Sequence, residues 1–95
     1  MLTGGTGLIG SHLLRSIGDT EDVVALSRNG HAAEASSVIS IDLGSDWSVD
    51  DLPDDIDVIV HLAQSEHYRD FPNQAQDVFT VNTVSTLKLL DFARS

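Results

Sequence analysis

The apolar residues of this chain form short runs that alternate with helical patterns. Four runs have the composition of strands, at residues 1–3, 23–27, 38–43 and 56–63. Helical spacing fills residues 8–18 and about 74–94. Because strands that alternate with helices form βαβ units, the pattern predicts an α/β fold with a parallel sheet.

The pattern also predicts which faces are buried. In the first helix Ile9, Leu13 and Ile17 lie four residues apart on one face. The run at 56–63 is almost continuously apolar, as in a strand buried on both faces. The second helix carries apolar or small residues on two sides, so we expect it to be largely buried. One side holds Val78, Val81, Ser85, Leu89 and Phe92, and the other holds Phe79, Thr86, Leu90 and Ala93. Residues 44–55 are acidic and contain Pro53, which predicts a loop with at most a short helix.

Composition narrows the range of partners. Ninety-five residues make at most one small domain, and the net charge is −10. An acidic surface repels nucleic acid and anionic membranes, and no apolar run reaches the ~20 residues of a membrane span. The chain has no cysteine and no signal peptide, so we expect a cytoplasmic protein. Its four histidines lack metal-ligand spacing, so no metal site is predicted.

A glycine-rich turn joins the first strand to the first helix. Gly4, Gly7 and Gly10 follow a G-x-x-G-x-x-G spacing within residues 3–10. Such a turn presents backbone N–H groups and the positive end of a helix dipole to one point, which suits the pyrophosphate of a dinucleotide. On the glycines alone, a turn that merely connects strand and helix is an equal alternative.

Ser27 and Arg28 follow the second strand, about 20 residues beyond the glycine turn. NAD-specific sites usually have an acidic residue there, which binds the ribose hydroxyls, whereas an Arg accommodates the 2′-phosphate of NADP. The acidic residue is missing here, so NADP is the expected cofactor, with NAD as the alternative. A solvent-exposed Arg in a βα turn is the competing interpretation.

Polar residues also end the third and fourth strands. Asp42 could accept a hydrogen bond from the adenine amino group while Leu43 covers the ring, although an Asx turn explains Asp42 equally well. His61 lies within an apolar strand and is interpreted as a hydrogen-bonded core histidine. Asn82 lies in the middle of an apolar helix, where a buried amide needs partners, so we expect it to brace a neighbouring strand or loop.

Five segments in order resemble the extended short-chain dehydrogenase/reductase family, in its NAD(P)-dependent epimerase/dehydratase branch. They read TGGTGLIGSHL, VVALSR, a strand-end DL, DVIVHLAQ and VNTVSTLKLLDFAR. The resemblance implies a Rossmann-like doubly wound parallel sheet of about four strands in the order 3-2-1-4. It also implies an oxidoreductase that acts on a sugar nucleotide or a similar carbinol or carbonyl substrate, and it admits a homodimer of the full-length protein.

The resemblance assigns cofactor contacts to particular residues. It places Arg28 by the adenosine ribose, and Asn82 as the helix Asn that supports the active-site strand. Gln64 departs from the small residue that is common at its position. The cofactor-binding residues implied are Gly4, Thr6, Gly7, Leu8, Ile9, Gly10, Ser27, Arg28, Asp42, Leu43, Leu62, Ala63, Gln64 and Asn82.

The catalytic pair of the family has no counterpart here. The family uses Tyr-x-x-x-Lys, but Pro72 comes four residues after Tyr68, and Val84 comes four residues before Lys88. We therefore predict no catalytic residue in this chain. Residues 1–95 are interpreted as the N-terminal part of an NAD(P)-binding domain, truncated at both ends, inactive alone and marginally stable. The alternatives are a non-catalytic NAD(P)-sensing module and a fragment without independent function.

Overall fold

The computed structural model describes residues 1–30, 34–65 and 72–94, and within them it contains one parallel four-stranded sheet. The strands are β1 (Leu2–Thr3), β2 (Val24–Ser27), β3 (Ser37–Ser40) and β4 (Val60–His61). They lie in the order β3-β2-β1-β4, which confirms the predicted order. The central strand β1 pairs with both neighbours, because Leu2 lies opposite Ala25 on one side and Val60 on the other.

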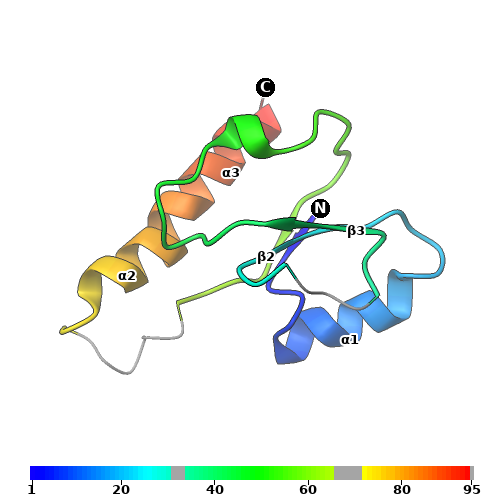
Figure 1. The fold of residues 1–95 in the computed structure, drawn as a ribbon, viewed down its shortest axis with the longest axis horizontal. Coiled ribbons are helices and arrows are strands. Elements are labelled where there is room, and N and C mark those ends of the chain that lie inside the picture. The colour runs from blue at the N-terminus through cyan, green and yellow to red at the C-terminus, as the bar shows by residue number, and fades with distance from the viewer. Residues whose placement is uncertain (31–33, 66–71, 95) are drawn as a thin grey trace.

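Helices cover both faces of this sheet (Figure 1). Helix α1 (Leu8–Ile17) lies on one face, and a long helical segment lies on the other. That segment consists of α2 (Ala75–Phe79), a π-helical stretch η2 (Thr80–Val84) and α3 (Ser85–Arg94). A short 3₁₀ helix, η1 (Val49–Asp51), lies in the acidic loop, as expected for residues 44–55. The predicted Rossmann-like doubly wound arrangement is therefore confirmed.

Each face of the sheet has its own apolar core. On the α1 side, Leu2 packs with Leu14 and Val23, all of them buried. On the other side a larger buried cluster joins the sheet to the long helical segment and the acidic loop. Its members are Leu26, Ile41, Leu43, Trp47, Leu52, Val81 and Leu89. Because side chains alternate along a strand, β1 supplies Leu2 to one face and Thr3 to the other.

The buried face of α1 differs from the prediction. Leu14 is fully buried, and Leu13 and Ile17 pack beside it. Ile9 was expected on this face but is 69% exposed. The start of the helix is held against the preceding turn by Gly10, which has no side chain, so the contact with the sheet begins one turn later.

The fourth strand is shorter and less buried than predicted. Residues 56–63 were expected to form one strand covered on both faces, but β4 contains only Val60 and His61, and Val58 is 65% exposed. Within the described residues β4 lies at the edge of the sheet and pairs only with β1. Because β1 has two residues, only two residues of β4 pair with it.

The second predicted helix forms over nearly its full length, but only one side of it is buried. Val81, Ser85 and Leu89 face the core as expected. On the opposite side Phe79 is 59% exposed and Leu90 is 63% exposed, so the prediction of a largely buried helix is wrong. Only the sheet-facing side has a layer of the described structure packed against it. No helix in the described parts of the chain has the length and apolar character needed to cross a membrane.

Candidate functional site

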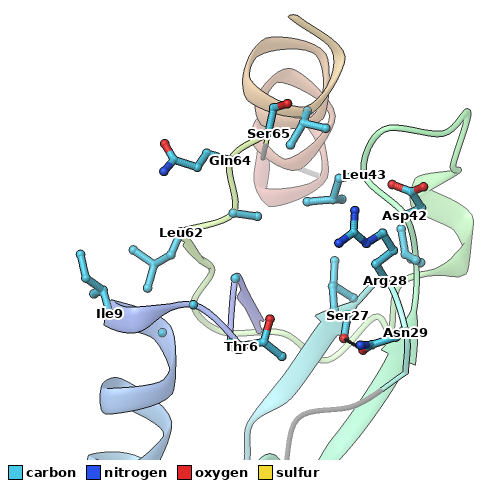
Figure 2. A pocket seen from close by; sticks show the side chains of 18 of the residues that line it. Thr6, Ile9, Ser27, Arg28, Asn29, Asp42, Leu43, Leu62, Gln64 and Ser65 are labelled. Carbon is cyan, nitrogen blue, oxygen red and sulfur yellow. Dashed lines mark hydrogen bonds between the residues drawn. The ribbon is translucent and has the colours of Figure 1, made fainter. Parts of the chain in front are cut away.

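An open cleft of about 740 Å³ lies where the carboxyl ends of the parallel strands meet. In open α/β sheets this edge is the usual place for a ligand. The cleft gathers residues from the glycine-rich turn, from the ends of β2 and β3, and from the segment after β4 (Figure 2). Of the predicted cofactor contacts, all except Asn82 line it. These are Gly4, Thr6, Gly7, Leu8, Ile9, Gly10, Ser27, Arg28, Asp42, Leu43, Leu62, Ala63 and Gln64.

Two glycines of the turn are required by close backbone contacts. Gly4 has φ +75°, and a Cβ there would lie 2.8 Å from the backbone of Leu62 and Ala63. A Cβ on Gly10 would lie 2.0 Å from the carbonyl oxygen of Gly4. Gly7 differs, because its Cβ would lie no closer than 3.4 Å to the same oxygen. The chain therefore has no packing reason for glycine at position 7, which borders the cleft.

The start of α1 faces the same cleft. Gly7 precedes the helix in an extended conformation, and no side chain caps the helix. The N–H groups of the first helical residues, beginning with Leu8, have no acceptor within the helix, because no helical turn precedes them. The first turn of α1 also lacks acidic residues, so the positive end of the helix dipole is not neutralised by its own side chains. This arrangement suits a phosphate or another anion.

The end of β2 forms one side of the cleft. Ser27 Oγ donates a hydrogen bond of 2.8 Å to Asn29 Oδ1, which fixes the turn after the strand. Figure 2 shows the Arg28 side chain apart from the Ser27–Asn29 pair, with its guanidinium extending toward the cleft near Leu43. The three consecutive residues 27–29 place a guanidinium, a hydroxyl and an amide at one edge of the site.

Asp42 and Leu43 border the same side from the end of β3. Asp42 Oδ1 accepts a hydrogen bond of 2.9 Å from the Gly44 N–H, so the Asx turn that sequence reasoning offered as an alternative is present. Leu43 is buried, and its carbonyl accepts a hydrogen bond of 2.8 Å from Ser85 Oγ. The loop after β3 is thereby attached to α3.

The segment after β4 forms the facing side, and Thr3 organises it. The N–H groups of Leu62 and Ala63 each donate to Thr3 Oγ1 at 3.1 Å. His61 is hydrogen-bonded at both ring nitrogens, to Thr3 Oγ1 at 2.6 Å and to Thr86 Oγ1 at 3.0 Å. Burial lowers the pKa of His61 below the ordinary value of a histidine. The predicted hydrogen bonding of His61 is therefore confirmed, but the residue is half-buried and does not lie in the core.

Asn82 supports the cleft from behind without lining it. Its Oδ1 accepts a hydrogen bond of 2.7 Å from the N–H of Ser65, so the expected brace to a neighbouring loop is present. The expectation that Asn82 is buried is wrong, because the residue is exposed. The buried partner is Ser65, at 2% exposure.

Sequence reasoning missed seven residues that line the cleft. They are Gly5, Leu26, Asn29, Ile41, Ser65, Asp77 and Val81. All except Asp77 directly adjoin a predicted residue along the chain. Asp77 comes from α2, and nothing in its local sequence connects it with the glycine turn.

Lys88 has a structural role. Its Nζ donates a hydrogen bond of 2.6 Å to the Trp47 carbonyl and lies 5.0 Å from the centre of the Trp47 ring. It does not line the cleft. Tyr68 lies outside the described residues. Within the described residues, no group of three or more histidine, aspartate or glutamate side chains could hold a metal ion.

Comparison with known proteins identifies the family. The chain matches the NAD dependent epimerase/dehydratase family over residues 1–95 and belongs to it. This family uses NAD(P), and its fold agrees with the sheet order and the glycine turn described above. Searches of curated proteins and of solved structures found no match.

Proposed function

We propose that this chain binds NADP(H) and forms the cofactor-binding part of an epimerase/dehydratase-type oxidoreductase. The observation that carries the proposal is the convergence on one cleft of a capless helix N-terminus, the turn at Gly7 and the cationic side chain of Arg28. A dinucleotide needs these features together, because its pyrophosphate and its ribose substituent lie at separate points.

The glycine turn fits a bound pyrophosphate. Gly4 and Gly10 are explained by contacts within the protein, but Gly7 is not. A residue that borders the cleft and has open space where its side chain would be is what close approach of a phosphate requires. The N–H groups at the start of α1 would bind the phosphate oxygens there.

The end of β2 supports NADP over NAD. A carboxylate at this point would select the ribose hydroxyls of NAD and repel a 2′-phosphate. The residues here are Ser27, Arg28 and Asn29, none of which is acidic. A guanidinium binds phosphate through paired hydrogen bonds, and the Asn29 side-chain NH₂ adds a neutral donor.

The cofactor would supply hydride transfer to or from a carbinol or carbonyl carbon of the substrate. The residues of this chain would bind the cofactor and orient it. The segment at residues 62–64 would lie along the half that carries the nicotinamide. The sequence contains no Tyr-x-x-x-Lys pair, and Lys88 is engaged with Trp47, so we infer that the 95-residue chain alone has no oxidoreductase or epimerase activity. A sugar nucleotide or a similar compound is the expected substrate class of the full-length protein.

Titration calorimetry of the 95-residue chain with NADPH and with NADH tests the proposal. NADPH should bind at least about tenfold more tightly, since one charge-assisted contact to a phosphate contributes roughly 1.5–3 kcal/mol. Arg28→Ala should remove most of this difference. Arg15→Ala, on the exposed side of α1, is the matched control and should leave it unchanged. Failure of the wild type to bind either dinucleotide would refute the proposal.

A further inference from the structure

Ser65, in the segment that follows β4, is held by two side chains of the long helical segment. Its hydroxyl donates to Asp77 Oδ2 at 2.5 Å, and its backbone N–H donates to Asn82 Oδ1 at 2.7 Å. Ser65 is 2% exposed, so water competes little for these bonds. A hydrogen bond to a carboxylate is shorter and stronger than one between neutral groups. We call these three residues the Ser65 clamp.

The clamp depends on the π-helical stretch. Asp77 and Asn82 are five positions apart, and positions at this spacing do not face the same partner in a regular α-helix. In η2 the hydrogen bonds run from residue i to residue i−5, instead of i−4 as in an α-helix. The Ser85 N–H, for example, donates to the Thr80 carbonyl. This wider turn brings both side chains to Ser65. Single π turns within α-helices are frequent at functional sites.

Asp77 also lies close to the other side of the cleft. A Cβ on Gly44 would lie 2.9 Å from Asp77 Oδ1, so the loop after β3 approaches this carboxylate closely. Asp77 itself lines the cleft. One side chain of α2 therefore lies beside the loop after β3 and holds the segment after β4. These are the two segments between which a dinucleotide would lie.

We propose that Asp77 is a positioning residue for the cofactor: through the Ser65 clamp it fixes the segment at residues 62–65 that faces the nicotinamide half. This proposal rests on the proposed function and extends it to a residue that the family resemblance did not indicate. Figure 2 shows Leu62, Gln64 and Ser65 along one side of the cleft, across from Arg28 and Asp42. Loss of the clamp should leave Arg28 in place. It should free residues 62–65, on the opposite side of the cleft, from the long helical segment.

The position of the clamp predicts a difference between ligands. NADPH spans both sides of the cleft, whereas 2′,5′-ADP represents only its adenosine half. Asp77→Ala should weaken NADPH binding about tenfold, the cost of one lost charge-assisted hydrogen bond, and should change 2′,5′-ADP binding less than about twofold. Asp77→Asn should restore NADPH binding to near the wild-type value, because its amide oxygen can accept the Ser65 hydroxyl.

Titration calorimetry of the 95-residue chain with both ligands tests this, with Asp91→Ala as the matched control. Asp91 is an exposed aspartate on α3 outside the cleft. Amide hydrogen exchange gives a second measurement that needs no ligand. The Ser65 N–H should exchange faster in Asp77→Ala than in the wild type, and at the wild-type rate in Asp91→Ala.

The outcomes separate the two proposals. Wild-type binding of NADPH that Asp77→Ala leaves unchanged would overturn the role of Asp77 while the proposed function stands. Equal weakening of both ligands by Asp77→Ala would also overturn it, because that result indicates general damage to the fold. A wild type that binds neither ligand would overturn the proposed function and the role of the clamp in it, even if Ser65 exchange accelerates.

Discussion

The hydroxyl of Thr3 lies 2.6 Å from Nδ1 of His61, and the direction of this hydrogen bond can be assigned. Thr3 Oγ1 already accepts the N–H groups of Leu62 and Ala63, so its own proton must point to the histidine. Nδ1 is then an acceptor, and the proton of the neutral ring is on Nε2, which donates to Thr86 Oγ1. The hydroxyl of Thr86 in turn donates to the backbone carbonyl one helical turn earlier, at 2.7 Å. The chain of hydrogen bonds therefore connects β1 to the long helical segment only while His61 is neutral.

This assignment predicts a pH dependence of stability. Because burial lowers the pKa of His61 in the folded state, the unfolded chain binds more protons below its ordinary pKa of about 6.5. The stabilisation from neutral His61 should be complete above that pH and should decrease as the pH falls toward the lowered pKa. Urea unfolding at several pH values between 7.5 and 5, followed by the fluorescence of Trp47, measures the free energy of unfolding.

His61→Asn is the test variant, because an amide does not titrate. Its free energy of unfolding at pH 7.5 should be about 1–3 kcal/mol lower than that of the wild type, because hydrogen bonds are broken. This free energy should also depend less steeply on pH than in the wild type. His12→Asn, at an exposed position on α1, provides the comparison and should keep the wild-type slope. An identical slope in His61→Asn would show that His61 does not carry the effect.

Substitutions at two glycines of the turn should have different effects: one should lower stability, and the other should abolish cofactor binding. Gly10→Ala forces a methyl group against the Gly4 carbonyl, 2.0 Å away, and should cost about 1–3 kcal/mol of stability or more. Gly7→Val has room within the protein and should cost at most about 1 kcal/mol, since Gly7 is the helix N-cap. Gly7→Val should nevertheless abolish NADPH binding, because the new side chain enters the cleft. A Gly7→Val chain that folds and binds with wild-type affinity in calorimetry would remove the phosphate-turn assignment.

Much of the fold could be predicted because its signals are local. The glycine spacing and the four apolar runs are contiguous in the chain, and parallel strands with intervening helices leave few arrangements. The cleft followed because the carboxyl ends of such strands meet at one edge. Arg28 and Asp42 could therefore be placed at this edge from strand positions alone.

The predictions were wrong or incomplete where strand length, burial or a side-chain contact depends on another part of the structure. The length of β4 depends on the two residues that β1 offers for pairing, which the apolar run at 56–63 does not reveal. Phe79 and Leu90 are apolar, but burial requires a partner on their side of the helix. The π turn was hidden because Val81, Ser85 and Leu89 keep a regular spacing of four. Asp77 could not be identified because its partner Ser65 is distant in sequence.

The preference between cofactors should reverse when a carboxylate ends β2. Ser27→Asp places a negative charge beside the expected 2′-phosphate and offers an acceptor to the ribose hydroxyls of NAD. The ratio of NADH to NADPH affinity should rise at least about tenfold in calorimetric titrations, since like-charge repulsion adds to the lost contact. Ser48→Asp is a suitable control, because Ser48 caps η1 outside the cleft and aspartate can also cap a helix. An unchanged ratio in Ser27→Asp would mean that the 2′-phosphate binds elsewhere.

Ser85 should be among the most sensitive positions for stability. Its side chain is 0% exposed, and Oγ donates to the Leu43 carbonyl at 2.8 Å while accepting the Trp47 Nε1–H at 3.1 Å. Ser85→Ala leaves both groups buried without a partner, which should cost about 1–3 kcal/mol in the free energy of unfolding. Because Leu43 lies at the edge of the cleft, NADPH affinity should also fall. Urea unfolding followed by Trp47 fluorescence measures the first effect, and calorimetry measures the second. Ser16→Ala, at an exposed position in α1, should change neither by more than a few tenths of a kcal/mol. A Ser85→Ala variant as stable as Ser16→Ala would show that these two hydrogen bonds do not hold the loop after β3 to α3.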